Sequence, residues 1–168
     1  TAFLAAGLFE RHDRRRVEVV GYSAGRDDAS LMRRRIAAAF DRFVDAHGWA
    51  PARLAQAIRD DRVDVLVDLS GHTSMGRLTA FAQRPAPLQI TYLGYANTTG
   101  LSCIDALLTD AIVDPPGSER WYTESLVRLA PGFACYTAPA YAPAVSDAPC
   151  RQNGYVTIGL LHGLAKLN

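Results

Sequence analysis

The clearest pattern in the sequence is a pair of short apolar runs, each followed by a polar, glycine-rich stretch. The first run spans residues 63–69 and is apolar except at Asp64 and Asp68, and the second spans residues 88–93. A nearly continuous apolar run of this length predicts a strand buried on both faces of a parallel sheet. Ligands of open parallel sheets bind beyond the carboxyl ends of the strands, so the two polar stretches are predicted to build a ligand site.

Helical and strand patterns alternate over the rest of the first two thirds of the chain. The predicted elements are a helix through Phe3, Leu4 and Leu8, a strand over 17–22, a helical stripe of Met32, Ile36, Phe40 and Phe43, a short strand over 40–44, and a helix opened by Pro51. This order predicts an α/β fold, a Rossmann-like parallel sheet with helices on both faces. No Gly-x-Gly-x-x-Gly follows a predicted strand and no P-loop motif occurs, which argues against both of those nucleotide sites.

The pattern changes after Asp110, where most of the prolines lie and the periodicity is weak. Residues 131–154 are therefore predicted to be a connecting segment, and Tyr155 to Leu161 to be a new buried strand. The expected division is a lobe over 1–130, the connection over 131–154, and the start of a second lobe over 155–168. Because the sequence begins inside a helical pattern without a methionine, we expect it to be a fragment.

Composition excludes several classes of partner. With 18 basic and 17 acidic side chains, the formal charge of +1 supplies no field for nucleic acid or an anionic membrane. The arginine triplets at 14–16 and 33–35 have acidic neighbours and are predicted to be solvated surface. There is no apolar run of transmembrane length and no signal peptide, so we expect a cytoplasmic protein. Three widely spaced cysteines, Cys103, Cys135 and Cys150, are expected to be reduced thiols.

A specific order of short motifs runs through residues 71–110. It consists of Gly71-His72-Thr73 with Arg77, then Phe81, Arg84-Pro85-Ala86-Pro87-Leu88-Gln89, Leu93-Gly94-Tyr95, Thr98-Thr99-Gly100, Asp105 and Asp110. Together these motifs resemble the catalytic region of the protein O-GlcNAc transferase family. The resemblance covers essentially the whole chain, as the first lobe of a two-lobed B-type glycosyltransferase, truncated at both ends.

The resemblance implies an inverting transfer of N-acetylglucosamine from UDP-N-acetylglucosamine to Ser or Thr hydroxyls of proteins. The donor would lie between the two lobes, and neither a metal nor a further cofactor is implied. The partners would be a nucleotide sugar and a protein or peptide acceptor. In this family tetratricopeptide repeats usually precede the lobe, and a His-containing catalytic loop precedes the helix with which this chain starts. The chain is therefore expected to be inactive alone.

The resemblance also assigns site residues in the first lobe. Leu93 and Gly94 match the loop whose backbone approaches the sugar, although Gly94 also suits a plain tight turn. Thr73 and Arg77 match positions facing the acceptor cleft, where a surface arginine is the alternative for Arg77. His72 is expected to line the site as a hydrogen-bonding aromatic wall rather than to act as a general base. Asp68 is interpreted as a strand end and not as a catalytic base.

The one catalytic assignment is Lys166, which matches a second-lobe lysine that neutralises charge on the departing diphosphate. A surface lysine at the start of a helix is its alternative. Two departures from the family pattern weaken the match, namely Gly163 in place of an amide side chain and Ala96 in place of proline. They leave open a degenerate lobe that binds without turnover. The fold alone also leaves open a different two-lobed nucleotide-sugar enzyme with a small or lipid-linked acceptor.

Overall fold

The computed structural model describes residues 2–74 and 76–159. The chain divides into two compact units, Thr1–Thr137 and Ala138–Asn168. The elements of the first unit are α1 (Ala2–Phe9), β1 (Val20–Ser23), α2 (Leu31–Ala38), β2 (Arg42–Asp45), α3 (Pro51–Asp60), β3 (Val65–Asp68), α4 (Leu78–Phe81), β4 (Leu88–Tyr92), β5 (Ala106–Thr109), the 3-10 helix η1 (Ser118–Trp121) and β6 (Ser125–Arg128).

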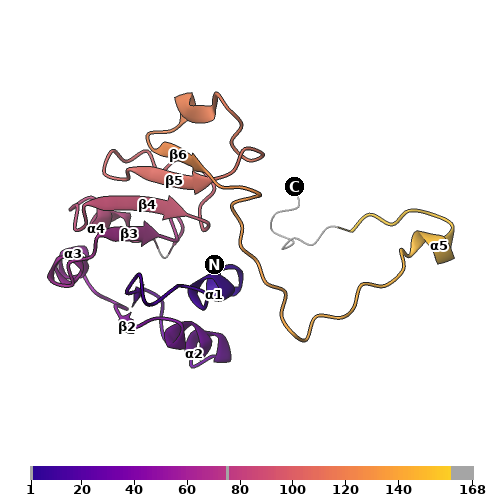
Figure 1. Ribbon diagram of the computed structural model, residues 1–168, viewed down its shortest axis with the longest axis horizontal. Helices are drawn as coiled ribbons and strands as arrows, with labels where there is room; N and C mark the ends of the chain where they lie inside the picture. The colour runs from indigo at the N-terminus through magenta and orange to yellow at the C-terminus, as the bar shows by residue number, and fades with distance from the viewer. Residues whose placement is uncertain (1, 75, 160–168) are drawn as a thin grey trace. The chain divides into compact units, whose positions relative to one another are not determined.

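The described strands form two parallel sheets rather than one. β1 pairs with β2, and the second sheet has the order β3, β4, β5, β6 (Figure 1). The predicted α/β class with parallel strands is confirmed, because each strand is joined to its parallel neighbour by a crossover that brings the chain back to the same end.

The core lies between α3, α4 and one face of the larger sheet. Pro51 opens α3 at a position where its missing N–H costs no hydrogen bond, as predicted. Leu54 and Ile58, four residues apart, then pack with Leu66 of β3 and Phe81 of α4. Burial of each such side chain stabilises the fold by about 1.5–3 kcal/mol.

One prediction about burial and one about the extent of a helix were wrong. Strand β3 was expected to be buried on both faces, but Val65 and Val67 are 47% and 41% exposed. The side chains of a strand alternate between its faces, and the helical core packs on the face that carries Leu66, away from Val65 and Val67. The helical stripe was expected to reach Phe43, but α2 ends at Ala38 and Phe43 belongs to β2.

The second unit contains one short helix in its described part, α5 (Cys150–Asn153). The strand predicted from Tyr155 is not formed over residues 155–159, where Val156 and Ile158 are 78% and 86% exposed. An isolated strand has no ladder partner to satisfy its backbone groups, so an apolar run alone does not produce one. The remainder of that predicted strand lies outside the described residues.

Surface features agree with the composition. Arginines of both triplets pair with acidic neighbours, including Arg14 with Asp41 and Arg35 with Glu10. All three cysteines are free, as predicted. In residues 2–74 and 76–159, no helix has the length and apolar character needed to cross a bilayer.

Candidate functional site

The parallel register brings the carboxyl ends of β3, β4 and β5 to one edge of the larger sheet. Asp68 lies beside Thr91, and Tyr92 lies beside Leu108. The loops 69–77, 93–105 and 110–124 all leave from this edge. The first two are the polar stretches that the sequence pattern indicated, so the site starts where an open α/β sheet conventionally binds its ligand.

Asp68 fixes the loop that follows β3. Its carboxylate is 4% exposed and accepts hydrogen bonds from the Gly71 N–H at 2.7 Å, the Ser70 N–H at 3.2 Å and the Thr91 hydroxyl at 3.0 Å. A carboxylate whose oxygens are engaged in this way holds backbone donors in place. Its geometry suits an anchor for the loop, consistent with its interpretation as a strand end.

The loops after β3 and β4 are joined through His72. Its Nε2 lies 2.8 Å from the carbonyl oxygen of Thr99, and its ring meets the Tyr95 ring edge-on at a centroid distance of 5.4 Å. Because a carbonyl oxygen only accepts, Nε2 carries a proton and donates it to Thr99.

Gly71 makes the close approach of the two loops possible. Its φ is +54°, and a Cβ added there would lie 2.3 Å from the Cβ of Tyr95. A side chain at this position would therefore be strained by its backbone and would also displace Tyr95.

The backbone turns sharply at Leu93, directly after β4. Leu93 has a φ of +67°, and the Gly94 N–H donates to the Tyr92 carbonyl oxygen at 2.8 Å, closing a three-residue turn. A bulky residue with positive φ is strained, and such strain is concentrated at functional sites. Leu93 and Gly94 were both predicted to bring the backbone close to a ligand, and of the two it is Leu93 that has the positive φ.

Thr73 and Arg77 occupy the far end of the loop after β3. Thr73 is exposed, and its hydroxyl donates to the Ser70 carbonyl oxygen at 2.8 Å. Arg77 donates through Nη2 to the Ala24 carbonyl oxygen at 3.3 Å, and its buried Nε has no partner among the described residues. Since Ala24 follows β1, Arg77 links the carboxyl ends of the two sheets.

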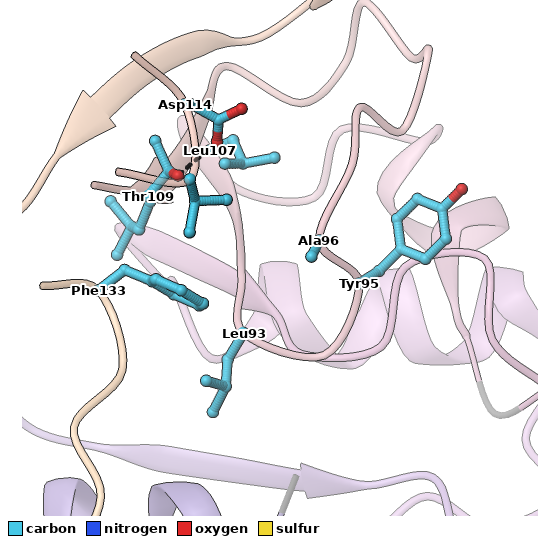
Figure 2. Close-up of a pocket in the computed structure, with 9 residues that line it drawn as sticks. Leu93, Tyr95, Ala96, Leu107, Thr109, Asp114 and Phe133 are labelled. Atoms are coloured by element: carbon cyan, nitrogen blue, oxygen red, sulfur yellow. Dashed lines mark hydrogen bonds between the residues drawn. The ribbon is translucent and has the colours of Figure 1, made fainter. Parts of the chain in front are cut away.

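A small hollow lies beside this edge, between the loop after β4 and the end of β5 (Figure 2). Leu93 and Phe133 border it, and the Tyr95 ring points away from it. Its volume is about 10 Å³, room for roughly one water molecule. A nucleotide sugar needs several hundred Å³, so this hollow does not by itself accommodate a donor.

Asp110, directly after β5, binds backbone N–H groups at the carboxyl edge of the sheet. Asp110 accepts from the N–H groups of Ile112 and Val113 at 2.9 and 2.8 Å and from that of Phe133 at 3.0 Å. These hydrogen bonds hold the pKa of Asp110 below its usual value. The sequence analysis named Asp110 as part of a motif without a role. A recognisable signal exists, because Asp after a strand often accepts from the backbone two residues on.

Glu124 was missed entirely by the sequence analysis. It is 4% exposed and accepts hydrogen bonds from Thr98 and Thr99 of the loop after β4. No local pattern marks it, since its partners lie about 25 residues away. Lys166 and Gly163 lie outside the described residues, so their predicted roles stay predictions.

Residues 1–136 match the family model described as glycosyl transferase family 41. The chain belongs to glycosyl transferase family 41. It is 46% identical over 123 residues to a tomato (Solanum lycopersicum) protein named as a probable UDP-N-acetylglucosamine–peptide N-acetylglucosaminyltransferase SPINDLY, covering 73% of this chain and 13% of that protein. It is 40% identical over 168 residues to the Arabidopsis thaliana protein of the same name, covering 98% and 18%.

A solved structure of a mutant O-GlcNAc transferase from Thermobaculum terrenum is also similar, with a TM-score of 0.82 and 41% identity. The match covers 87% of this family 41 chain and 28% of that chain. The family resemblance inferred from residues 71–110 is therefore confirmed. The chain spans less than a fifth of the length of the curated relatives named above.

Proposed function

We propose that this family 41 chain forms the first lobe of an inverting glycosyltransferase that moves N-acetylglucosamine from UDP-N-acetylglucosamine to Ser or Thr hydroxyls of proteins. The observation that carries the proposal is the interlocked pair of loops at the carboxyl edge, joined by His72 and Thr99. The printed names of the similar plant proteins support the donor and the protein acceptor. We further propose that residues 131–154 connect this lobe to a second lobe. We also propose a cytoplasmic location for the protein.

The reaction requires an acceptor hydroxyl to attack the anomeric carbon while the bond to the diphosphate breaks. The hydroxyl proton must leave, and negative charge develops on the departing phosphate oxygen. In our proposal Lys166 neutralises that charge, and the backbone at Leu93 and Gly94 meets the sugar. The strained turn at Leu93 supports this role, because it exposes main chain that a ligand can approach.

His72, Thr73 and Arg77 form the proposed acceptor side. In our proposal Nδ1 of His72 accepts a hydrogen bond from a substrate hydroxyl. The exposed Thr73 hydroxyl donates its hydrogen to Ser70, so its oxygen can accept from a peptide N–H group, and Arg77 adds a positive charge to the same loop. This arrangement supports substrate positioning by these three residues, with His72 as a wall of the site.

The test uses the polypeptide encoded by the whole gene, because the chain spans only part of its relatives. The enzyme is incubated with a protein extract and a panel of radiolabelled nucleotide sugars that differ in base and sugar. We expect labelled protein with UDP-N-acetylglucosamine as the donor. The label should be lost in Lys166→Ala and partly retained in Lys166→Arg. Arginine retains the charge but not the geometry of lysine.

Other outcomes contradict parts of the proposal. Label from another nucleotide sugar would overturn the donor assignment and leave protein glycosylation standing. Labelled small molecules or lipid without labelled protein would favour the alternative acceptor class. Nucleotide-sugar binding by calorimetry without any transfer would favour the degenerate binding lobe that Ala96 and Gly163 suggest.

A further inference from the structure

A buried carboxylate lies beneath the loop after β4. Glu124, directly before β6, accepts through Oε1 from the Thr99 N–H at 2.7 Å and through Oε2 from the Thr98 hydroxyl at 2.7 Å and the Thr123 hydroxyl at 3.1 Å. The Thr99 hydroxyl also donates to Oε1. These four hydrogen bonds satisfy a side chain that is 4% exposed.

The charge on Glu124 has no counter-ion in the described part of the chain, where none of the ion pairs includes it. Burial raises its pKa, but the hydrogen bonds from Thr99 and Thr98 outweigh that effect and hold the pKa below its usual value. An ionised carboxylate buried without a cation is costly, and here only hydroxyls and one amide offset the cost. The residue therefore fixes the orientation of these donors.

Thr99 carries this constraint to the site. Its N–H and hydroxyl are held by Glu124, and its carbonyl oxygen accepts from Nε2 of His72 at 2.8 Å. Thr99 is itself buried, at 4% exposure, so it has little freedom to turn. The orientation and the tautomer of the exposed His72 thus depend on a carboxylate that His72 does not touch.

We propose that Glu124 is a positioning residue of the candidate site: by locking Thr99 it presents His72 with Nε2 protonated and Nδ1 free to accept from a substrate hydroxyl. This inference rests on the proposed function for the identity of that hydroxyl, which belongs to the sugar or to the acceptor. Glu124 acts through Thr99 and touches no reacting atom.

The geometry predicts that the length of the Glu124 side chain matters for this role and that its charge does not. In Glu124→Gln the amide oxygen still accepts from Thr99, and the NH₂ group can donate to the Thr123 hydroxyl oxygen, which lies 3.1 Å from Oε2 of Glu124. In Glu124→Asp the charge is retained but the carboxylate is withdrawn by one methylene. Glu124→Gln should therefore behave like wild type, whereas Glu124→Asp and Glu124→Ala should not.

The first measurement is independent of catalysis. Imidazole ¹⁵N shifts of the histidine-labelled whole-gene polypeptide, assigned with His72→Gln, report which ring nitrogen is protonated. We expect the Nε2–H form of His72 in wild type and Glu124→Gln, and a mixture of tautomers in Glu124→Asp and Glu124→Ala. Glu119→Ala is the matched control, because Glu119 is an exposed glutamate five residues away that pairs with Arg128. An unchanged tautomer in folded Glu124→Asp would overturn the inference.

The second measurement is kinetic. Loss of the hydrogen bonds in Glu124→Asp should raise KM about tenfold or more. If the KM for the donor rises, the hydroxyl that donates to Nδ1 belongs to the sugar. If the KM for the acceptor rises, that hydroxyl belongs to the acceptor. Because Glu124 acts through His72, the double variant with His72→Ala should be no worse than His72→Ala alone. Multiplicative losses would contradict the inference. Absence of transfer by wild type, with the expected tautomer shift, would refute the proposed function and leave the positioning role intact.

Discussion

At the scale of single residues, the site depends on backbone conformations that few side chains tolerate. Gly71 combines a positive φ with a contact to Tyr95 that leaves no room for a Cβ. Gly48 has a similar φ of +72° but nothing within 4 Å of an added Cβ. The two glycines therefore separate the effect of backbone strain from the effect of a steric clash.

We predict that Gly71→Ala destabilises the protein by more than Gly48→Ala. Both variants force alanine into the left-handed region at a cost of about 1 kcal/mol. Only Gly71→Ala must also displace Tyr95 from His72, so it should reduce substrate affinity as well. Urea unfolding and calorimetry of both variants make the comparison. Equal losses of stability with unchanged affinity would show that the loops do not need this close approach.

At the scale of elements, the side-chain amide of Gln89 adds hydrogen bonds between strand β4 and the segments beside it. Gln89 is fully buried and donates through Nε2 to the carbonyl oxygens of Phe81, at 3.0 Å, and Cys103, at 2.7 Å. Its N–H donates to Asp105, which also pairs with Arg84. The strand is thus tied both to α4 and to the loop that leads into β5.

We predict that Gln89→Leu lowers the free energy of unfolding by about 1–3 kcal/mol, because two side-chain hydrogen bonds are lost and each contributes about 0.5–1.5 kcal/mol. Gln56→Leu is the matched control, since Gln56 lies on the exposed surface of α3 and bonds only to Asp60 in the described residues. It should change stability by less than about 0.5 kcal/mol. Chemical denaturation of both variants tests this, and a neutral Gln89→Leu would show that the hydrogen bonds from Arg84 to the same two carbonyl oxygens are sufficient.

At the scale of the whole molecule, the carboxylates are stabilised in their ionised form. The Arg128 guanidinium lowers the pKa of Glu119 from its ordinary 4.5 to about 2. The pKa of Asp61 is lowered by hydrogen bonds from Arg42 and Tyr22, and that of Asp105 by the Gln89 N–H and Arg84. Since these groups bind protons more weakly in the folded state, protons favour the unfolded state.

We therefore predict that the contribution of these carboxylates to the free energy of unfolding is fully present above about pH 4.5 and is lost as the pH falls toward about 2. The urea midpoint should decrease steadily between about pH 5 and about pH 3. In Glu119→Gln the decrease should be smaller, because one of the depressed groups no longer titrates. A midpoint independent of pH over this range would mean that the surface pairs contribute nothing measurable, as many exposed pairs do.

The sequence by itself determined the parallel α/β order, the loops at the carboxyl edge and the family. Apolar period and turn residues are local properties, so the strands at 65–68 and 88–92 and the helix from Pro51 followed from them. The motif order of residues 71–110 identified the family without any coordinates.

Only the tertiary structure decided which partners these residues have. The hydrogen bonds of Glu124 with Thr99, of His72 with Thr99 and of Arg77 with Ala24 join residues 25, 27 and 53 positions apart. The packing of α3 and α4 likewise decided that Val65 and Val67 are exposed, because the helical core covers the Leu66 face of β3. Such pairings depend on how distant segments meet in space, which the local periodicity of a single sequence does not encode.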